Sequence, residues 1–428
     1  MTITPQYFQV TNNDIFKQQM LSWADRSSIF CLLDNNGYNF SAPAFECILA
    51  VGSRRTVDIH GSNAFEKLKE FYDQSPTWMF GHVGYNLTSP GHNTTGPDSD
   101  NEFPPGFFFE PEVIIQLEKE KLIIMASVGE ADKIYNEICA ITVQALQKSK
   151  PAVKVTAGIN EEEYIQTINA LKDHIRRGDC YEINFCQRFL SDHATINPIH
   201  TYVKLAETSP MPFAALYKLN ENYCICASPE RYLKKTGDKI ISQPMKGTSE
   251  RNSVDAGEDE SNKNYLLQSN KERSENVMIV DLVRNDLSKV CREGSVIVEE
   301  LFGVYSFPHV HQMTSTISGI IRKDLHWTQA LSATFPMGSM TGAPKQRVME
   351  LIAQYEQYGR GLFSGSIGYV TPDADFDFNV VIRSIFYNRN KMQLSFYAGS
   401  GITFHSDPLE EYEECKLKTN AIIEVLSN

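Results

Sequence analysis

The sequence has no long apolar run, no excess of positive charge and no closely paired cysteines, and each absence excludes a class of protein. No apolar stretch approaches the roughly 20 residues that a membrane-spanning helix needs. The net charge of −13 and the lack of a basic run interleaved with aromatic residues argue against a nucleic-acid partner. The nine cysteines are scattered without a CxxC pair, which is typical of reduced core residues rather than of a disulfide or zinc framework.

The N-terminal residues also lack the cationic start and the apolar stretch of a secretory signal. We therefore expect a cytoplasmic protein that binds neither membranes nor nucleic acids. Its 428 residues, 42% of them hydrophobic, are sufficient for a sizeable folded core.

Turn-forming residues suggest how the chain is divided. Residues 86–106 are dense in Gly, Pro, Asn and Ser and predict a long surface loop. Residues 148–160 are a better boundary, because the helix signals sharpen after them. The boundary gives an N-terminal part, 1–150, and a larger part, 151–428.

The larger part begins with a well-marked helix. Asn160 is its predicted cap, acids fill its first turn, and two arginines and a glycine at 176–178 mark its end. Strand-like runs then alternate with helices in an α+β or α/β pattern. This pattern leaves the order of the strands open.

Two predicted helices carry acid pairs with the same spacing. Glu272 and Glu275 are three residues apart in one helix, and Glu411 and Glu414 are three residues apart in the last helix. One interpretation is a solvated face on each helix, with Lys418 one turn beyond Glu414 as a partner. The other is that the two helices face each other across a cleft, where the four carboxylates suit Mg²⁺, which prefers hard oxygen ligands and keeps several waters.

Two glycine-containing segments predict close approach of the backbone to a ligand. Residues 335–352 run from a loop of small residues, Ser339 among them, into a helix whose N-terminal amides attract anions; an ordinary loop–helix junction is the alternative. Residues 398–403, which include Gly399 and Gly401, predict a second close-approach turn. Neither segment has the glycine spacing of a dinucleotide fingerprint or a P-loop.

Three charged residues lie in or beside predicted strands. Arg383 falls in an apolar run, where an unpaired charge is costly, so it needs either a structural acid or a ligand carboxylate as partner. Glu230 follows a proline at a strand end and is either a catalytic acid or base or an exposed turn residue. Lys246 lies in "QPMKGTSER". Because most lysines are exposed, the ordinary interpretation is that Lys246 is a solvated surface residue.

The chain resembles the chorismate-utilising enzymes from about residue 160 to its end. Many segments match this family in order, which makes the resemblance specific. The matching segments are residues 178–189, 228–233, 243–251, 274–287, 310–317, 335–352, 359–369, 382–385, 398–403 and 406–418. The resemblance implies an α+β fold, an α/β sandwich like that of anthranilate synthase component I, with two antiparallel sheets packed face to face and helices outside. It also implies chorismate as the substrate, bound in a deep cleft.

Within this resemblance Lys246 indicates the branch of the family. Its position is Ala in typical members that make anthranilate and Lys in members that make 4-amino-4-deoxychorismate for para-aminobenzoate and folate synthesis, where it is the nucleophile on the ring. Members that make isochorismate carry a lysine where Glu182 aligns here. The aminodeoxychorismate branch is therefore implied, with anthranilate synthesis or a catalytically silent regulatory subunit as alternatives.

The resemblance also assigns roles to the acids. Glu275 and Glu414, supported by Glu272 and Glu411, are implied to hold Mg²⁺, which binds and polarises the ring carboxylate of chorismate. Glu230 is implied as the general acid and base. A lysine of pKa about 10.4 is neutral in only about one molecule in 2,000 at pH 7, so the nucleophile needs a semi-buried, base-assisted site.

The remaining implied residues bind the substrate. Ser339, Arg383 and the amides around Gly399 and Gly401 are expected to hold its carboxylates, and Thr248 is expected to be a further ligand. Ammonia must be supplied from elsewhere, because none of the cysteines lies on the glycine-flanked elbow that a glutaminase nucleophile needs. A separate glutamine amidotransferase subunit is therefore the expected partner.

Three positions depart from the family pattern. Gln312 stands where the family usually has a histidine, and the neighbouring His311 would point to the other side of a strand. Phe363 replaces a residue that is often Tyr. In the N-terminal part, a segment like the tryptophan pocket of some members has Asn35 in place of a small residue, so tryptophan is a candidate ligand there.

Overall fold

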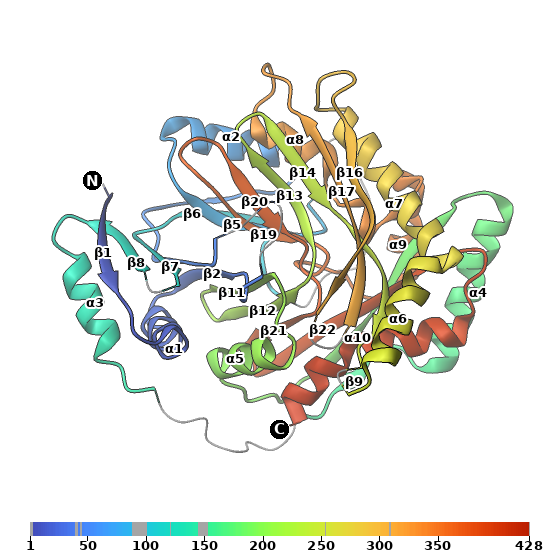
Figure 1. The fold of residues 1–428 in the computed structure, drawn as a ribbon, viewed down its shortest axis with the longest axis horizontal. Coiled ribbons are helices and arrows are strands. Elements are labelled where there is room, and N and C mark those ends of the chain that lie inside the picture. Colours follow the sequence, from blue (N-terminus) through green and yellow to red (C-terminus); the bar gives the residue numbers. More distant parts are fainter. Residues whose placement is uncertain are drawn as a thin grey trace.

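Two antiparallel sheets form the centre of the computed structural model, which describes residues 3–38, 42, 45–87, 101–119, 121–143, 153–252, 254–307 and 310–427 (Figure 1). One sheet has the strand order β1-β8-β7-β3-β2-β11-β12-β21-β22-β10-β18, with β9 paired to β10. The other has the order β15-β17-β14-β13-β20-β19-β5-β6-β4, with β16 paired to β17. We call them the first and the second sheet.

The strands and helices have the following bounds. The strands of the first sheet are β1 (Ile3–Gln9), β2 (Ile29–Asp34), β3 (Cys47–Val51), β7 (Val113–Glu118), β8 (Lys121–Ser127), β9 (Thr156–Ala157), β10 (Glu182–Ser191), β11 (Phe213–Leu219), β12 (Asn222–Ser228), β18 (Gly342–Ala343), β21 (Ser384–Asn388) and β22 (Gln393–Ile402). Those of the second sheet are β4 (Arg55–Asp58), β5 (Met79–Val83), β6 (Gly106–Glu110), β13 (Arg231–Thr236), β14 (Lys239–Gln243), β15 (Met245–Glu250), β16 (Ile297–Ser306), β17 (Val310–Ile320), β19 (Ser366–Val370) and β20 (Phe376–Asn379). The helices are α1 (Asn13–Ala24), α2 (Ala64–Gln74), α3 (Ala131–Cys139), α4 (Glu161–Arg177), α5 (Pro198–Thr208), α6 (Ala256–Gln268), α7 (Asn270–Ser288), α8 (Trp327–Thr334), the short 3₁₀ turn η1 (Gly338–Met340), α9 (Lys345–Tyr355) and α10 (Pro408–Ser427).

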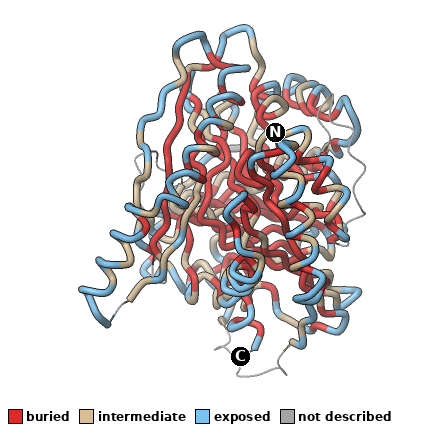
Figure 2. Tube along the Cα trace, turned by 90° about the vertical axis from the view of Figure 1, so that its right-hand side faces the viewer, coloured by how far each residue is buried: buried red, intermediate tan, exposed pale blue. Residues whose placement is uncertain are grey.

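The packing of apolar side chains shows that the sheets lie face to face. One buried cluster joins Phe80 and Phe109 of the second sheet to Ala215, Phe386 and Tyr397 of the first sheet. Two further clusters lie on the outer faces, where α1, α3, α4, α5, α9 and α10 cover the first sheet and α2, α7 and α8 cover the second. Figure 2 shows buried residues along the central strands and exposed residues on the outer helices and loops. The predicted sandwich with helices outside is confirmed.

The N-terminal part contributes to both sheets. In the first sheet β2 pairs with β11, and in the second sheet β5 pairs with β19. Strands from 3–127 therefore share their hydrogen bonding and their core with strands from the larger part. The predicted surface loop falls mostly at 88–100, and the predicted boundary starts at 148–152; both ranges lie outside the described residues. The rest of the boundary, 153–160, contains β9.

Local signals placed the helix ends correctly. Asn160 caps α4 and forms a reciprocal capping box with Glu163, and Gly178 ends the helix at φ +84°. Asp407 Oδ1 accepts hydrogen bonds from the amides of Leu409 and Glu410 at the start of α10. These ends depend on residues within one turn of each other, so the sequence alone predicts them.

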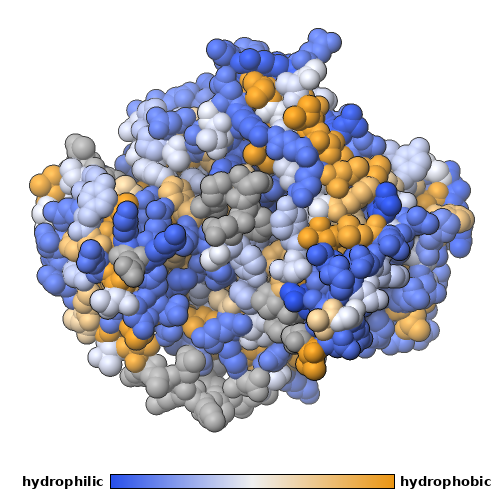
Figure 3. All heavy atoms as spheres, viewed as in Figure 1, coloured by the Kyte–Doolittle hydropathy of each residue, from blue (hydrophilic) through white to orange (hydrophobic). Residues whose placement is uncertain are grey.

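The surface of the protein carries exposed apolar residues in several areas, one of which lies over α7 and β16. Figure 3 shows hydrophobic side chains over the region of α7 and β16, and the exposed apolar residues of these elements are Val277, Ile297, Val298 and Leu301. Across the described ranges, every helix is too short or too polar to cross a membrane.

Candidate active site

Lys246 lies where the two sheets and α7 meet. It belongs to β15, and its Nζ is 2.6 Å from Oε1 of Glu182 on β10 and 3.8 Å from Oε2 of Glu275 on α7. Its side chain is only 11% exposed. The interpretation of Lys246 as an ordinary surface lysine is therefore wrong.

The electrostatics of Lys246 are set by two opposing effects. Burial alone lowers its pKa, but the carboxylates of Glu182, Glu275 and Glu414 outweigh burial and raise the pKa above its ordinary value. The lysine is thus held as an ammonium ion, and it must give up a proton before it can act as a nucleophile.

Glycine at position 401 makes room for this ion pair. Gly401 lies on β22 opposite Asn184 of β10. A Cβ atom there would lie 2.7 Å from Oε1 of Glu182 and would collide with Nζ of Lys246. Gly399 has a comparable role further along β22, because a Cβ atom there would collide with Cys186. Both glycines lie inside a strand, so the predicted turn at 398–403 is wrong.

Glu230 is a buried acid held by Ser339. It is 4% exposed, and its Oε1 accepts a hydrogen bond of 2.6 Å from the hydroxyl of Ser339 in η1. Burial raises the pKa of Glu230 to about 7, although the Ser339 hydrogen bond and the nearby cations Lys246 and Arg383 oppose this shift. A carboxyl group with a pKa near neutral pH can both donate and accept a proton, as general acid–base catalysis requires. The alternative of an exposed turn residue is excluded.

The raised pKa of Glu230 predicts a pH-dependent stability. Its ordinary pKa of 4.5 is raised to about 7 in the folded protein, so the stability that this group contributes is present below pH 4.5 and is lost as the pH rises through 7. The loss amounts to at most about 3 kcal/mol. Glu230→Gln cannot ionise, so we expect it to melt a few degrees higher than the wild type at pH 8 and at nearly the same temperature at pH 4.5. Calorimetry at both pH values tests this, and an equal shift at the two values contradicts it.

Arg383 is a half-buried residue near Glu230. Burial lowers its pKa to about 10, and the nearby Glu230 opposes this shift. Its Nη1 contacts Sδ of Met211 at 3.9 Å, and within the described ranges it forms no ion pair with an acid. No acid lies within ion-pair distance of Arg383 among the described residues, and a ligand carboxylate as its partner stays a prediction. Arg383 precedes β21 and has φ +52°, so its predicted place within a strand is wrong.

Two of the four paired acids are buried instead of lying on a solvated face, and Glu275 and Glu414 are close enough to Lys246 to raise its pKa. Glu275 and Glu411 are buried, and burial raises the pKa of Glu275 to about 7. Burial also raises the pKa of Glu272, whose Oε2 lies 2.9 Å from the Cβ position of Gly247 beside Lys246. The two helices approach each other at the ion pair of Lys271 on α7 with Glu411 on α10, 3.4 Å long.

Glu414 agrees with the solvated-face interpretation in one respect, its pairing with Lys418. Its Oε1 is 2.6 Å from Nζ of Lys418, the partner expected one turn away, and this cation lowers the pKa of Glu414. Lys418 also donates a hydrogen bond of 2.8 Å to the carbonyl of Gly399. Three of the four acids thus contact lysines, and Glu272 has no ion pair among the described residues. In the same part of the chain no group of three or more His, Cys, Asp or Glu side chains is arranged as a metal site.

Several polar atoms around Lys246 are buried without a hydrogen-bond partner among the described residues. They are Oε2 of Glu182, Oε1 of Glu275, Oε1 of Gln312 and Oγ1 of Thr314. Thr314 is opposite Met245 and Gln312 is opposite Thr248, so both lie on β17 beside the strand of Lys246. Buried polar atoms are almost always hydrogen-bonded in native proteins, so each of these atoms needs an ordered water or a polar ligand as its partner.

The structure also shows where the residues that depart from the family pattern lie. Gln312 is buried beside the site, while His311 points away and contacts Ser306 and Asp259. Phe363 is buried and stacks on Tyr397, with ring centroids 4.9 Å apart, so it contributes apolar packing between the sheets. Thr248 is exposed on β15.

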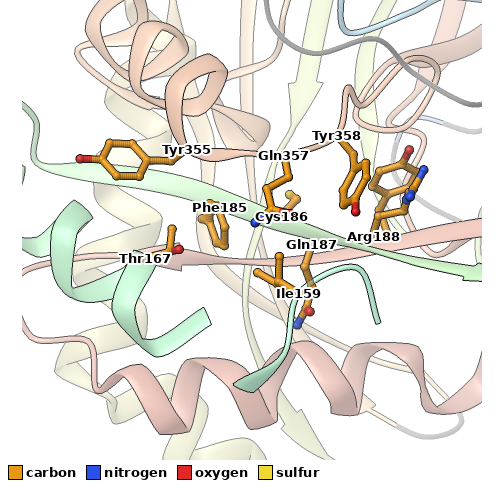
Figure 4. A pocket seen from close by; sticks show the side chains of 10 residues that line it. Ile159, Thr167, Phe185, Cys186, Gln187, Arg188, Tyr355, Gln357 and Tyr358 are labelled. Carbon is orange, nitrogen blue, oxygen red and sulfur yellow. The ribbon is translucent and has the colours of Figure 1, made fainter. Parts of the chain in front are cut away.

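Two hollows lie away from Lys246. Figure 4 shows one beside β10, where Gln187 and the guanidinium of Arg188, stacked 3.6 Å over the ring of Tyr358, line a space of about 10 Å³ that suits one water molecule. The other, of about 30 Å³, is lined by Asp34, Asn35 and residues of β3, β11, β19 and β20. Asn35, from the predicted tryptophan segment, thus lies at a hollow between the two sheets, and tryptophan binding there stays a prediction.

Sequence reasoning missed the importance of Glu182. Its position was considered only as the place of a lysine in other enzymes, whereas the structure places it 2.6 Å from Lys246. The local sequence carries only a weak signal, because Glu182 stands at the start of the segment 182–186, which also contains the polar Asn184.

The fold and the buried acids around one lysine define an α+β enzyme site for a small polar substrate. The family model of chorismate binding enzymes matches residues 31–424, so the chain belongs to this family. It is 38% identical over 294 residues to the chloroplastic aminodeoxychorismate synthase of Arabidopsis thaliana, covering 67% of this chain and 32% of that protein. It is 35% identical over 286 residues to aminodeoxychorismate synthase component 1 of Bacillus subtilis, covering 67% and 60%.

A solved structure agrees with the fold. The crystal structure of anthranilate synthase component I from Streptococcus pneumoniae superimposes with a TM-score of 0.76 at 25% identity, covering 90% of this chain and 93% of that one. The chain therefore spans about a third of the plant relative and 60% of the bacterial relative, but nearly the whole of this structural neighbour.

Proposed function

We propose that the protein converts chorismate and ammonia to 4-amino-4-deoxychorismate, an intermediate for para-aminobenzoate and folate. The observation that carries this proposal is Nζ of Lys246, buried between Glu182 and Glu275 at the position of the family's lysine nucleophile. The names of the Arabidopsis thaliana and Bacillus subtilis relatives support the same activity.

The residues of the site have three roles in the proposed reaction: substrate binding, nucleophilic attack and proton transfer. The Arg383 guanidinium and the Ser339 hydroxyl bind and orient the carboxylates of chorismate. Nζ of Lys246 forms a bond to C2 of the ring, the ring double bonds shift, and the C4 hydroxyl leaves as water with a proton from Glu230. Ammonia then adds at C4 and the bond between C2 and Nζ breaks, which restores the lysine.

The acids fit Mg²⁺ chemically. Glu275, Glu414, Glu272 and Glu411 offer hard oxygen donors, and Oε1 of Glu275 is buried without a partner in the described part of the structure. We propose that these residues hold the ion in exchange for their lysine contacts. When bound, Mg²⁺ would supply Lewis-acid polarisation of the ring carboxylate.

Ammonia is proposed to come from a glutamine amidotransferase subunit. The relative from Bacillus subtilis is named component 1. Eight of the nine cysteines are buried and only Cys139 is exposed, which gives no sign of a reactive glutaminase thiol. The cytoplasm is the proposed location, although the relative from Arabidopsis thaliana is named chloroplastic.

Product identification tests the proposed function. Purified protein with chorismate, magnesium chloride and ammonium chloride at alkaline pH is expected to yield an aminated product that keeps its enolpyruvyl group. Mass spectrometry detects this product, and a lactate dehydrogenase assay should detect no stoichiometric pyruvate. Anthranilate with one equivalent of pyruvate would instead establish the tryptophan branch, in line with the structural neighbour from Streptococcus pneumoniae.

A catalytically silent regulatory subunit is the alternative from another class. The hollow lined by Asp34 and Asn35 is the place where this alternative would put its ligand, an aromatic amino acid such as tryptophan, although its present volume of about 30 Å³ is too small for one. This alternative predicts tryptophan binding in calorimetry and no turnover of chorismate with saturating Mg²⁺ and ammonium. Turnover of chorismate under these conditions excludes it, whether or not tryptophan binds.

A further inference from the structure

Lys271 joins the two helices that carry the paired acids. It is the second residue of α7, and its Nζ is 3.4 Å from Oε1 of Glu411 on α10. No other ion pair links α7 to α10 among the described residues. The side chain of Glu411 is only 2% exposed, so this contact supplies the positive charge that a buried carboxylate needs.

The charge of Lys271 acts on all four paired acids. Glu272 follows it directly in α7, and Glu275 lies four residues further on, which places Lys271 and Glu275 on one face of the helix. Burial lowers the pKa of Lys271, but the four carboxylates outweigh burial and raise the pKa above its ordinary value; they are those of Glu411, Glu275, Glu414 and Glu272. The ammonium group thus lies among the same four acids that the proposed function assigns to Mg²⁺.

The contacts of Lys271 also allow it to leave these acids. Its side chain is 42% exposed, so the ammonium group can turn into water without repacking of the core. The other two lysines are held more firmly. Lys246 is 11% exposed and lies 2.6 Å from a carboxylate oxygen, and Lys418 lies 2.6 Å from Glu414 and donates a further hydrogen bond of 2.8 Å to a backbone carbonyl.

We propose that Lys271 is an exchangeable counter-ion of the magnesium site, which neutralises Glu411 when the metal is absent and leaves Glu411 when Mg²⁺ binds. The proposal rests on the Mg²⁺ ligands of the proposed function and adds the residue that competes with the ion. Mg²⁺ carries two positive charges and the ammonium group carries one, so the four carboxylates attract the metal more strongly. Breaking the contact of Lys271 with Glu411 costs free energy, so the lysine lowers the affinity for Mg²⁺ while it stabilises the metal-free protein.

The test is Lys271→Met, which keeps the length and the apolar stem of the side chain but removes its charge. Metal-free protein is titrated with magnesium chloride in a calorimeter, and the Kd for Mg²⁺ should be about tenfold lower in the variant, the effect of one screened unit charge near the site. The metal-free variant should melt below the metal-free wild type, because Glu411 loses its partner, and saturating magnesium chloride should remove this difference. Lys271→Gln, a second neutral variant, should show the same gain in affinity. Lys271→Arg keeps the charge and should bind Mg²⁺ within about threefold of the wild type.

Lys289→Met is the matched control. Lys289 is 49% exposed and pairs with the buried acid Asp286 at 2.9 Å, much as Lys271 pairs with Glu411. It lies 18 residues beyond Lys271 at the other end of α7, about 27 Å away along the helix axis. The substitution changes the net charge of the protein by the same amount, so the Kd for Mg²⁺ should stay unchanged, and any loss in melting temperature should persist in magnesium chloride.

The possible results separate this proposal from the proposed function. Unchanged or weaker Mg²⁺ binding by Lys271→Met overturns the counter-ion role, and an equal gain in Lys289→Met overturns it as well, because the effect would then come from net charge. If the wild type binds no Mg²⁺ in the titration, the magnesium site of the proposed function fails and the counter-ion role fails with it. If the wild type binds Mg²⁺ and Lys271→Met binds it more tightly, but chorismate yields no aminated product, the proposed function fails and the counter-ion role stands.

Discussion

Replacing Lys246 with Ala is expected to abolish formation of the aminated product, by on the order of 10³-fold or more, because the variant lacks the nucleophile on which the proposed reaction depends. The substitution also removes the cation that contacts Glu182 at 2.6 Å and Glu275 at 3.8 Å. Loss of stability could therefore imitate loss of catalysis. Lys246→Arg separates the two, because it keeps the positive charge but is not a nucleophile at neutral pH. Both variants should be inactive, and only Lys246→Ala should show a large change in melting temperature.

A matched control comes from a second semi-buried lysine. Lys218 is 6% exposed on its side chain and pairs with Asp25 at 3.2 Å, but it lies on β11 outside the cluster of acids. Lys218→Met should lower the melting temperature and keep the same product at a similar kcat. Product formation by Lys246→Ala at more than a tenth of the wild-type rate would show that the lysine is not the nucleophile. Release of pyruvate by this variant would instead indicate that the lysine directs the reaction away from anthranilate.

Much of the fold could be predicted, for two different reasons. The ends of α4 and α10 depend on capping residues within one turn, so the sequence alone locates them. The two sheets could be predicted only through resemblance, because pairings such as β2 with β11 and β5 with β19 join residues far apart in the chain. Hydrophobic patterns do not determine such pairings.

The candidate site was predictable in its members and less so in its geometry. The spacing of Glu272, Glu275, Glu411 and Glu414 identified the acids, but a helix face with this spacing is more often solvated, and only the structure shows that Glu275 and Glu411 are buried. Arg383 was placed in a strand, whereas tertiary packing holds it at φ +52°. A left-handed residue other than glycine has no strong local signal, so sequence patterns do not predict it.

The protonation state of Lys246 is the property of the site that the sequence predicts least well. The need for a neutral nucleophile suggested a lysine with a lowered pKa, yet the acids around Lys246 raise its pKa. The resting site is therefore an ion pair, and proton transfer to a neighbouring carboxylate must precede attack. Proton transfer in the site therefore depends on the acids, of which Glu230 and Glu275 both have a pKa of about 7.

Replacing Glu230 with Gln is expected to lower kcat by about 10²- to 10⁴-fold, the usual contribution of a general acid or base, while the KM for chorismate stays within threefold. Gln can still accept the hydrogen bond from Ser339, so the geometry of η1 should persist. With a pKa of about 7, Glu230 is a competent acid only below that pH, so the wild-type kcat/KM should fall as the pH rises through 7. This limb should disappear in Glu230→Gln.

Ser339→Ala provides the complementary measurement. The hydrogen bond from Ser339 lowers the pKa of Glu230, so its removal should raise that pKa and move the falling limb of the pH profile to higher pH. A profile that is unchanged in both variants would assign the limb to another group and remove Glu230 from the proton transfer. A limb that moves with Ser339→Ala and vanishes with Glu230→Gln can come only from this carboxyl group, since no other acid in the described residues accepts a hydrogen bond from Ser339.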